Sequence, residues 1–182
     1  MPDEALTRLL RGQLFGDAEA RTYALLDGAS VPDLPQRLWE YEPEYDCVFE
    51  GELEPDIAEV APYLVTLEPD APFTEWVLDR GWGNHWGIFL LSADPIYRLH
   101  RHFRRFTLVR DPDDKILYFR YYDPRVLRVY LPLCNPEEMD TVFGPVRCFL
   151  LEDEDPAVLL RFSRGRGQPE RERIPLEASE AT

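Results

Sequence analysis

The chain has 182 residues, of which 45% are hydrophobic, and this length and composition are typical of one globular domain. Its net charge of −15 argues against nucleic-acid binding, because such binding needs basic side chains that neutralise phosphates. No apolar run approaches the ~20 residues that a membrane helix needs, and the acidic N-terminus does not resemble a signal peptide. We therefore expect a soluble, cytoplasmic protein that binds neither nucleic acid nor a membrane.

The charge is unevenly distributed along the chain. Residues 1–97 carry a net charge of −15 and residues 129–182 a net charge of −5. Between them, residues 98–128 contain nine basic and four acidic residues, a net charge of +5. A basic segment in an acidic protein indicates either ion pairing across the fold or a separate docking face.

Hydrophobic periodicity predicts the elements of the first half of the chain. We expect helices over 4–15, 32–43 and 71–82, and strands over 21–28, 45–51, 62–68 and 86–92. The last of these strands is almost continuously apolar, which indicates that both of its faces are buried.

A helix is predicted over 93–106, with Asp94 as its N-cap and Pro95 as its first residue. Its apolar residues form one stripe, and a basic face lies beside that stripe. The basic face consists of Arg98, Arg101 and Arg105.

Residues 106–123 predict a hairpin, in which two strands flank an Asp-Pro-Asp-Asp connection. Side chains of 116–122 alternate between two largely apolar faces, so the second strand is predicted to be central in a sheet. Two further strands are expected over 146–153 and 157–164.

Strands that alternate with helices predict an α/β or α+β domain, in which a mixed β-sheet has helices packed on its faces. We assign a single domain to residues 1–164. After Arg164 the sequence lacks aromatic residues and is rich in Arg, Glu, Gly and Pro, so residues 165–182 are predicted to be a disordered tail.

The junction "YFRYYDPRVLRVYLP" (118–132) joins an aromatic strand to a helix. Asp123 is predicted to cap that helix and Pro124 to begin it, which explains the Asp-Pro pair without chemistry. Arg120 on a central strand is predicted to be largely buried, and a buried arginine needs a carboxylate partner, for which Asp27 and Asp123 are the candidates. A ligand-binding arginine and an exposed one remain the alternatives. The expected structural motif comprises Asp27, Arg120, Asp123, Pro124 and Arg125.

Residues with catalytic chemistry are sparse. The chain has no GxSxG motif, and its three cysteines, which form no CxxC pair, are expected to be free thiols. His100 and His102 are two residues apart on a predicted helix and would point in different directions, so we expect no metal site. The segment GWGNHWG (81–87) forms either a packed aromatic corner or the wall of a pocket.

We expect no enzymatic activity and no cofactor. The alternative is a small-ligand-binding or enzymatic domain that uses Arg120, Tyr122 and the Trp82–Trp86 corner.

Four segments, in this order, carry a resemblance to a known family: "YALLDGASVPDLPQRL" (23–38), "APYLVTLEPD" (61–70), "WGIFLLSADPIYRLHRHFRRFTLVRDPDDKILYFRYYDPRVL" (86–127) and "FGPVRCFLLED" (143–153). Together they resemble the bacterial family called domain of unknown function 4123. The resemblance covers roughly residues 20–153, and many members of that family continue into a longer helical C-terminal region.

This resemblance implies a non-enzymatic role, because the family is known as effector adaptors, or chaperones, of the type VI secretion system. Such an adaptor binds one secreted toxic effector and helps to load it on the trimeric valine-glycine-repeat spike. The expected partners are therefore the effector and the spike protein, and a purely structural subunit of the spike is a third possibility. Arg98, Arg101 and Arg105 are our candidates for partner binding.

Overall fold

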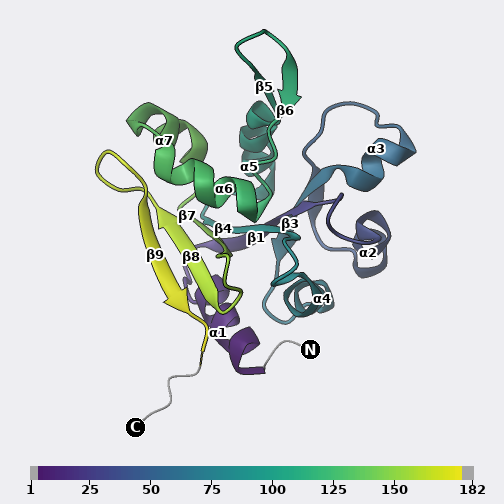
Figure 1. Ribbon diagram of the computed structural model, residues 1–182. Coiled ribbons are helices and arrows are strands. Elements are labelled where there is room, and N and C mark those ends of the chain that lie inside the picture. Colours follow the sequence, from purple (N-terminus) through teal and green to yellow (C-terminus); the bar gives the residue numbers. More distant parts are fainter. Residues whose placement is uncertain (1–3, 178–182) are drawn as a thin grey trace.

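The computed structural model describes residues 4–177, which form helices on both faces of one large sheet and a separate small hairpin (Figure 1). The α-helices are α1 (Glu4–Phe15), α2 (Leu34–Tyr41), α3 (Pro55–Val60), α4 (Pro72–Gly81), α5 (Ile96–Phe103), α6 (Pro124–Tyr130) and α7 (Pro136–Phe143). Two 3-10 helices are η1 (Arg104–Phe106) and η2 (Leu131–Leu133). The strands are β1 (Arg21–Asp27), β2 (Tyr45–Cys47), β3 (Pro62–Leu67), β4 (Gly87–Ser92), β5 (Leu108–Arg110), β6 (Ile116–Tyr118), β7 (Cys148–Glu152), β8 (Val158–Ser163) and β9 (Glu170–Pro175).

Seven strands form the large sheet in the order β2-β3-β1-β4-β7-β8-β9. Every neighbouring pair among them is antiparallel. The α+β class is confirmed, but the sheet is not mixed as predicted. A helix between two strands can return the chain in either direction, so the alternation of elements in the sequence does not determine strand direction.

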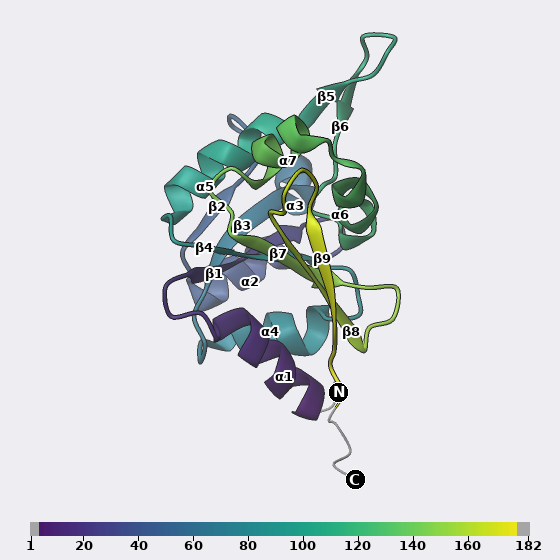
Figure 2. The same ribbon diagram turned by 90° about the vertical axis from the view of Figure 1, so that its left-hand side faces the viewer.

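Helices cover both faces of this sheet, as Figures 1 and 2 show. Leucines of α1, α2 and α4 pack on one face in a first apolar core, and α5, α6 and α7 pack on the other face in a second core. Successive residues of β1 belong alternately to the two cores, with Ala24 and Leu26 in the first and Tyr23 and Leu25 in the second. The continuous burial of β4 follows from this arrangement, as its sequence predicted.

The structure confirms one of the two predicted helix N-caps and contradicts the other. Asp123 is the N-cap of α6, where its side chain accepts a hydrogen bond from the backbone N–H of Arg125, as predicted. The predicted cap at Asp94 is wrong, because α5 begins at Ile96 and Pro95 occupies the N-cap position. The carboxylate of Asp94 binds Arg98 instead, at 2.9 Å.

The predicted hairpin forms, but it does not join the large sheet. β5 and β6 pair only with each other, with Leu108 opposite Tyr118 and Arg110 opposite Ile116. All six strand residues are exposed. The prediction of a central strand over 116–122 is therefore wrong, because the strand ends at Tyr118 and its apolar residues are exposed, whereas Tyr121 and Tyr122 are buried beyond its end.

The predicted disordered tail is wrong for the residues that form β9, which pairs with all of β8. Beyond it, Leu176 is buried and packs in the first core. The domain therefore extends past the predicted boundary at 164, and residues 178–182 lie outside the described part of the chain. A strand rich in Glu and Arg is stable here because its backbone completes the sheet, while its charged side chains stay in water.

We predict that Leu176→Ala lowers the free energy of unfolding by about 2–3 kcal/mol, because it removes a buried side chain from the first core. Urea denaturation measures this loss. Arg171→Ala, which changes an exposed side chain of the same strand, is the control and should alter stability by less than about 0.5 kcal/mol. Random-coil amide signals for residues 170–175 would contradict the assignment of β9.

Candidate functional site

The carboxylate of Asp27 lies at the end of β1 and is almost completely buried. Its Oδ1 accepts a hydrogen bond from the backbone N–H of Ala29, and its Oδ2 accepts one from the Ser30 hydroxyl, each at 3.0 Å. Arg120 donates a further hydrogen bond to Oδ2 from the junction between the hairpin and α6. The predicted ion pair therefore forms, and its partner is Asp27.

Arg120 also lies near the second carboxylate of the junction. Its Nη2 is 3.9 Å from Oδ2 of Asp123, which Arg125 holds through its own Nη2 at 2.8 Å. Although burial opposes the change, the hydrogen bonds from Arg125 hold the pKa of Asp123 below its usual value. The side chain of Arg120 is 43% exposed, so the prediction that it is largely buried is wrong.

These contacts make the junction a structural connection between distant parts of the chain. Pro124 is buried at the start of α6, as expected for the first helical residue. Burial and the charge of Asp27 raise the pKa of Tyr122 to about 12, so this hydroxyl stays protonated at neutral pH. The motif predicted from the sequence is thus assembled, and each of its carboxylates already has an arginine partner.

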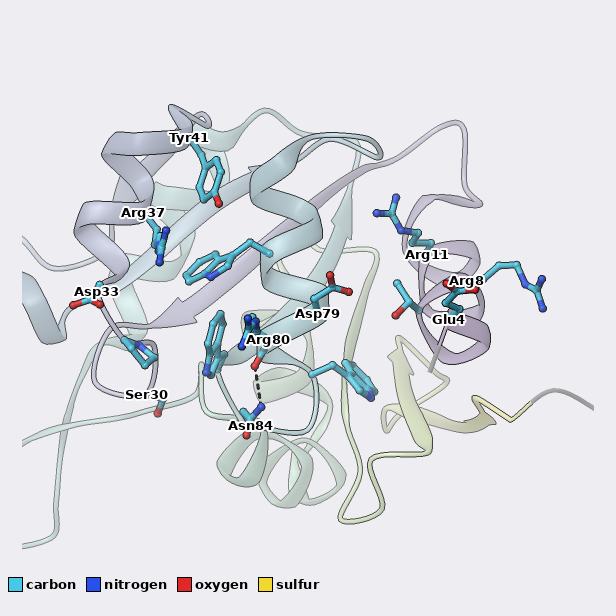
Figure 3. Close-up of a pocket in the computed structure, with 15 residues that line it drawn as sticks. Glu4, Arg8, Arg11, Ser30, Asp33, Arg37, Tyr41, Asp79, Arg80 and Asn84 are labelled. Atoms are coloured by element: carbon cyan, nitrogen blue, oxygen red, sulfur yellow. Dashed lines mark hydrogen bonds between the residues drawn. The ribbon is translucent and has the colours of Figure 1, made fainter. Parts of the chain in front are cut away.

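A wide groove of about 1470 Å³ lies between α1, α2 and α4 (Figure 3). Arg37 and Tyr41 lie on one side of it and Arg8 and Arg11 on the other. Its lining consists of Glu4, Thr7, Arg8, Arg11, Ser30, Pro32, Asp33, Arg37, Tyr41, Trp76, Asp79, Arg80, Trp82, Asn84 and Trp86.

The Trp82–Trp86 corner belongs to this groove, but its side chains also pack in the first core. The rings of Trp76 and Trp86 are 4.7 Å apart, and the guanidinium of Arg37 lies 5.7 Å from the Trp76 ring centre. Arg120 and Tyr122 are not part of the groove lining. The residues of the alternative ligand site are therefore divided between two places in the fold.

The predicted basic face lies on α5 and η1, and its three arginines differ in availability. Arg98 is paired with Asp94, and Arg105 donates a hydrogen bond to Nδ1 of His102 at 3.2 Å. Arg101 is exposed and, within residues 4–177, has no ion pair. Arg101 and Arg105 thus retain charges that no carboxylate of the described chain neutralises.

The two histidines of α5 point to different neighbours, as their spacing predicted. Nε2 of His100 lies 2.7 Å from the carbonyl oxygen of Cys47, and Nε2 of His102 lies 2.8 Å from that of Val142. Each carbonyl requires a donor, so Nε2 carries the proton in both rings. In residues 4–177 no group of three or more Cys, His, Asp or Glu side chains is placed to hold a metal ion.

The structure also reveals a buried carboxylate that sequence reasoning missed. Glu152 ends β7, and its oxygens accept hydrogen bonds from the backbone N–H of Gly83 (3.0 Å) and from Nδ1 of His85 (2.8 Å). Burial raises the pKa of Glu152, although the charge of His85 opposes this change. Because 67 residues separate the two side chains, no local pattern could have identified the pair.

The remaining predictions concern thiols and membranes. Cys47, Cys134 and Cys148 are all free, as expected, and the last two are buried. Among residues 4–177, no helix combines the length and the apolar character needed to cross a membrane.

A family model described as Domain of unknown function (DUF4123) matches residues 22–141, which is well over half of the chain. The chain belongs to this family. No curated protein and no solved structure matched the chain in the other two comparisons.

The DUF4123 segment contains both halves of the Asp27–Arg120 pair, the basic face and the hairpin β5–β6. It ends before β7, β8 and β9, but β7 pairs with β4 of the matched segment. The DUF4123 segment and the strands after it therefore form one sheet.

We predict that Asp123→Ala lowers the free energy of unfolding by about 1–2 kcal/mol, because α6 loses its cap and Arg125 loses its partner. Asp94→Ala is the matched control, since Asp94 also precedes a helix after a strand but forms only an exposed pair, and its loss should cost less than about 0.5 kcal/mol. Thermal or urea denaturation compares the two. Equal effects of both substitutions would contradict the assigned cap.

We predict that the stability of the protein depends on pH partly through His102. Burial lowers the pKa of this ring below its ordinary value of 6.5, so on acidification the unfolded chain takes up a proton here before the native state does. The contribution of His102 is therefore present at neutral pH and is lost as pH falls below 6.5. Between pH 7.5 and 5.5, the free energy of unfolding should fall more in the wild type than in His102→Gln. Equal changes in both proteins would show that folding does not lower the pKa of this ring.

Proposed function

We propose that this protein is a non-enzymatic adaptor, or chaperone, that binds a secreted effector of the type VI secretion system and helps to load it on the valine-glycine-repeat spike. The observation that carries this proposal is membership of the DUF4123 family, whose model matches residues 22–141. The role itself is the one that the resemblance of the sequence to that family implies.

The surface of the protein supports a binding role. Arg101 and Arg105 present positive charge that the described chain does not neutralise, in a protein whose net charge is −15. Such a local reversal of charge attracts an acidic partner face and repels a basic one. The adaptor contacts the spike directly or through the effector, and we assign the basic face to the effector.

Genes of such adaptors typically lie between effector and spike genes, so co-expression with the effector and spike genes expected beside this gene tests the proposal. Size-exclusion chromatography of the purified protein is the readout. We expect the effector to co-elute with this chain, and deletion of the gene to abolish effector-dependent killing. If neither protein co-elutes and killing survives the deletion, the adaptor role is wrong. The groove beside Trp82 and Trp86 would then be the place to look for a ligand.

We predict that charge reversal of Arg101 and Arg105 to Glu slows association with the effector several-fold at low salt, because these side chains steer the acidic partner. The difference should shrink in 0.5 M salt, where screening is strong. Stopped-flow or biosensor kinetics measure both rates. Reversal of Arg98 should add less, because Asp94 already neutralises it.

Arg166→Glu with Arg171→Glu is the matched control, since it changes the net charge equally at exposed positions at the other end of the domain sequence. It should leave the association rate close to that of the wild type. An equal slowing by both double variants would mean that net charge alone, and not the basic face, governs the encounter.

A further inference from the structure

The hairpin β5–β6 exposes apolar side chains on both of its faces. Leu108, Ile116 and Tyr118 lie on one face and Val109 and Leu117 on the other, as the antiparallel register requires. Their exposed fractions are between 39% and 63%. Tyr118 packs on Phe49 at 5.1 Å and is still the most exposed of the five. The hairpin projects from the body in two orthogonal views (Figures 1 and 2), and its apolar side chains belong to neither apolar core of residues 4–177. A two-stranded hairpin without a packing layer is only marginally stable.

The edges of the large sheet contrast with this hairpin. β9 presents alternating Glu and Arg side chains at one edge, and β2 at the other edge has only three residues. Charged and very short edge strands are common devices against unwanted pairing. The strands of the hairpin are as short as β2, but five of their six residues are exposed and apolar, and Arg110 is the one charged residue among them. This apolar surface is the part of the described chain best suited to a partner.

The hairpin is also held in one conformation before any partner arrives. Oδ1 of Asp111 accepts hydrogen bonds from the backbone N–H groups of Asp113 and Lys115, each at 2.9 Å, and Arg110 pairs with Asp114 at 2.8 Å. At the other end, the backbone N–H of Phe119 donates to the carbonyl of Thr107. A preformed element loses less conformational entropy on binding than a flexible loop.

We propose that this hairpin is the element that inserts into the effector, and that it occupies an open groove with apolar walls and carboxylates at its mouth. Two apolar faces require a partner surface on both sides, which a groove offers and a flat surface does not. The charged tip, with Asp111, Asp113 and Asp114, must stay in water, so the groove is open at its far end. Arg101 and Arg105 precede β5 in the sequence, so we place them at the mouth of the effector groove. Acidic side chains of the effector would complement their charge there. This inference rests on the proposed adaptor function, because it takes the effector as the occupant.

Ile116→Thr with Leu117→Thr removes one apolar side chain from each face and keeps residues that favour a strand. These side chains lie outside both apolar cores, so the melting temperature should stay that of the wild type. With the product of the neighbouring effector gene as the probe, we expect the dissociation constant to rise at least tenfold. Trp39→Ser, which removes a still more exposed apolar side chain on α2, is the control and should leave the dissociation constant unchanged.

Hydrogen exchange of the wild-type complex provides a second measurement, in which amides of residues 108–118 should gain protection from the effector. If the wild type binds the effector and the double variant binds equally, or Trp39→Ser weakens binding as much, the hairpin assignment is wrong and the adaptor function stands. If the wild type binds no effector, both fail. A concentration-dependent dimer of the isolated wild type that the double variant abolishes, detected by sedimentation velocity, would replace the effector by a second copy of this chain.

Discussion

The contact between Asp27 and Arg120 connects two segments that are 93 residues apart, and much of the structure depends on it. On one side, the carboxylate organises the turn after β1 through Ala29 and Ser30. On the other side, Arg120 stands between the base of the hairpin and the cap of α6. The pair therefore determines where the hairpin leaves the body of the protein and where the helix after it begins.

The physical reason for this arrangement is the cost of burying a charge. Asp27 is almost completely buried, and an unpaired carboxylate there would be strongly destabilising. Arg120 can neutralise it while its own side chain keeps partial contact with water, so only one member of the pair is fully desolvated. Alternative folds of residues 106–123 that move Arg120 away from Asp27 lose this compensation. The ion pair thus favours the same position of the segment as the packing of Tyr121 and Tyr122 in the second core.

Much of the secondary structure follows from local patterns, and the errors occur where burial or strand pairing depends on distant residues. Continuous apolar runs identified β1, β3 and β4, and an Asp-Pro pair identified the start of α6. The pattern of 116–122 was equally apolar, but no local signal reports whether a covering layer exists, so an exposed hairpin was taken for a central strand. β9 was missed for the opposite reason, since four of its six residues are charged and its position depends mainly on backbone pairing with β8, with Ile174 packed against the first core. In the candidate site, the basic face and the Asp27–Arg120 pair could be predicted from the sequence. The pair of Glu152 with His85 and the groove lining could not, because they bring together residues that are far apart in the sequence.

The contacts that hold the fold and the surface proposed to bind a partner are separate sets of residues. Asp27, Asp123 and Leu176 are buried in or against the two cores, whereas the apolar side chains of the hairpin contribute to neither core. Such a division suits a protein that must bind and later release another, because the hairpin sequence can vary with the partner at little cost to the stability of the domain. This division also limits the contact area, because the two hairpin strands have only six residues in total and offer a small apolar surface. A complex with so small an apolar contact also needs the charges at the base of the hairpin for its stability. Salt concentration and the acidity of the partner therefore change the affinity of this complex through the basic residues, whereas the apolar strands provide its specificity.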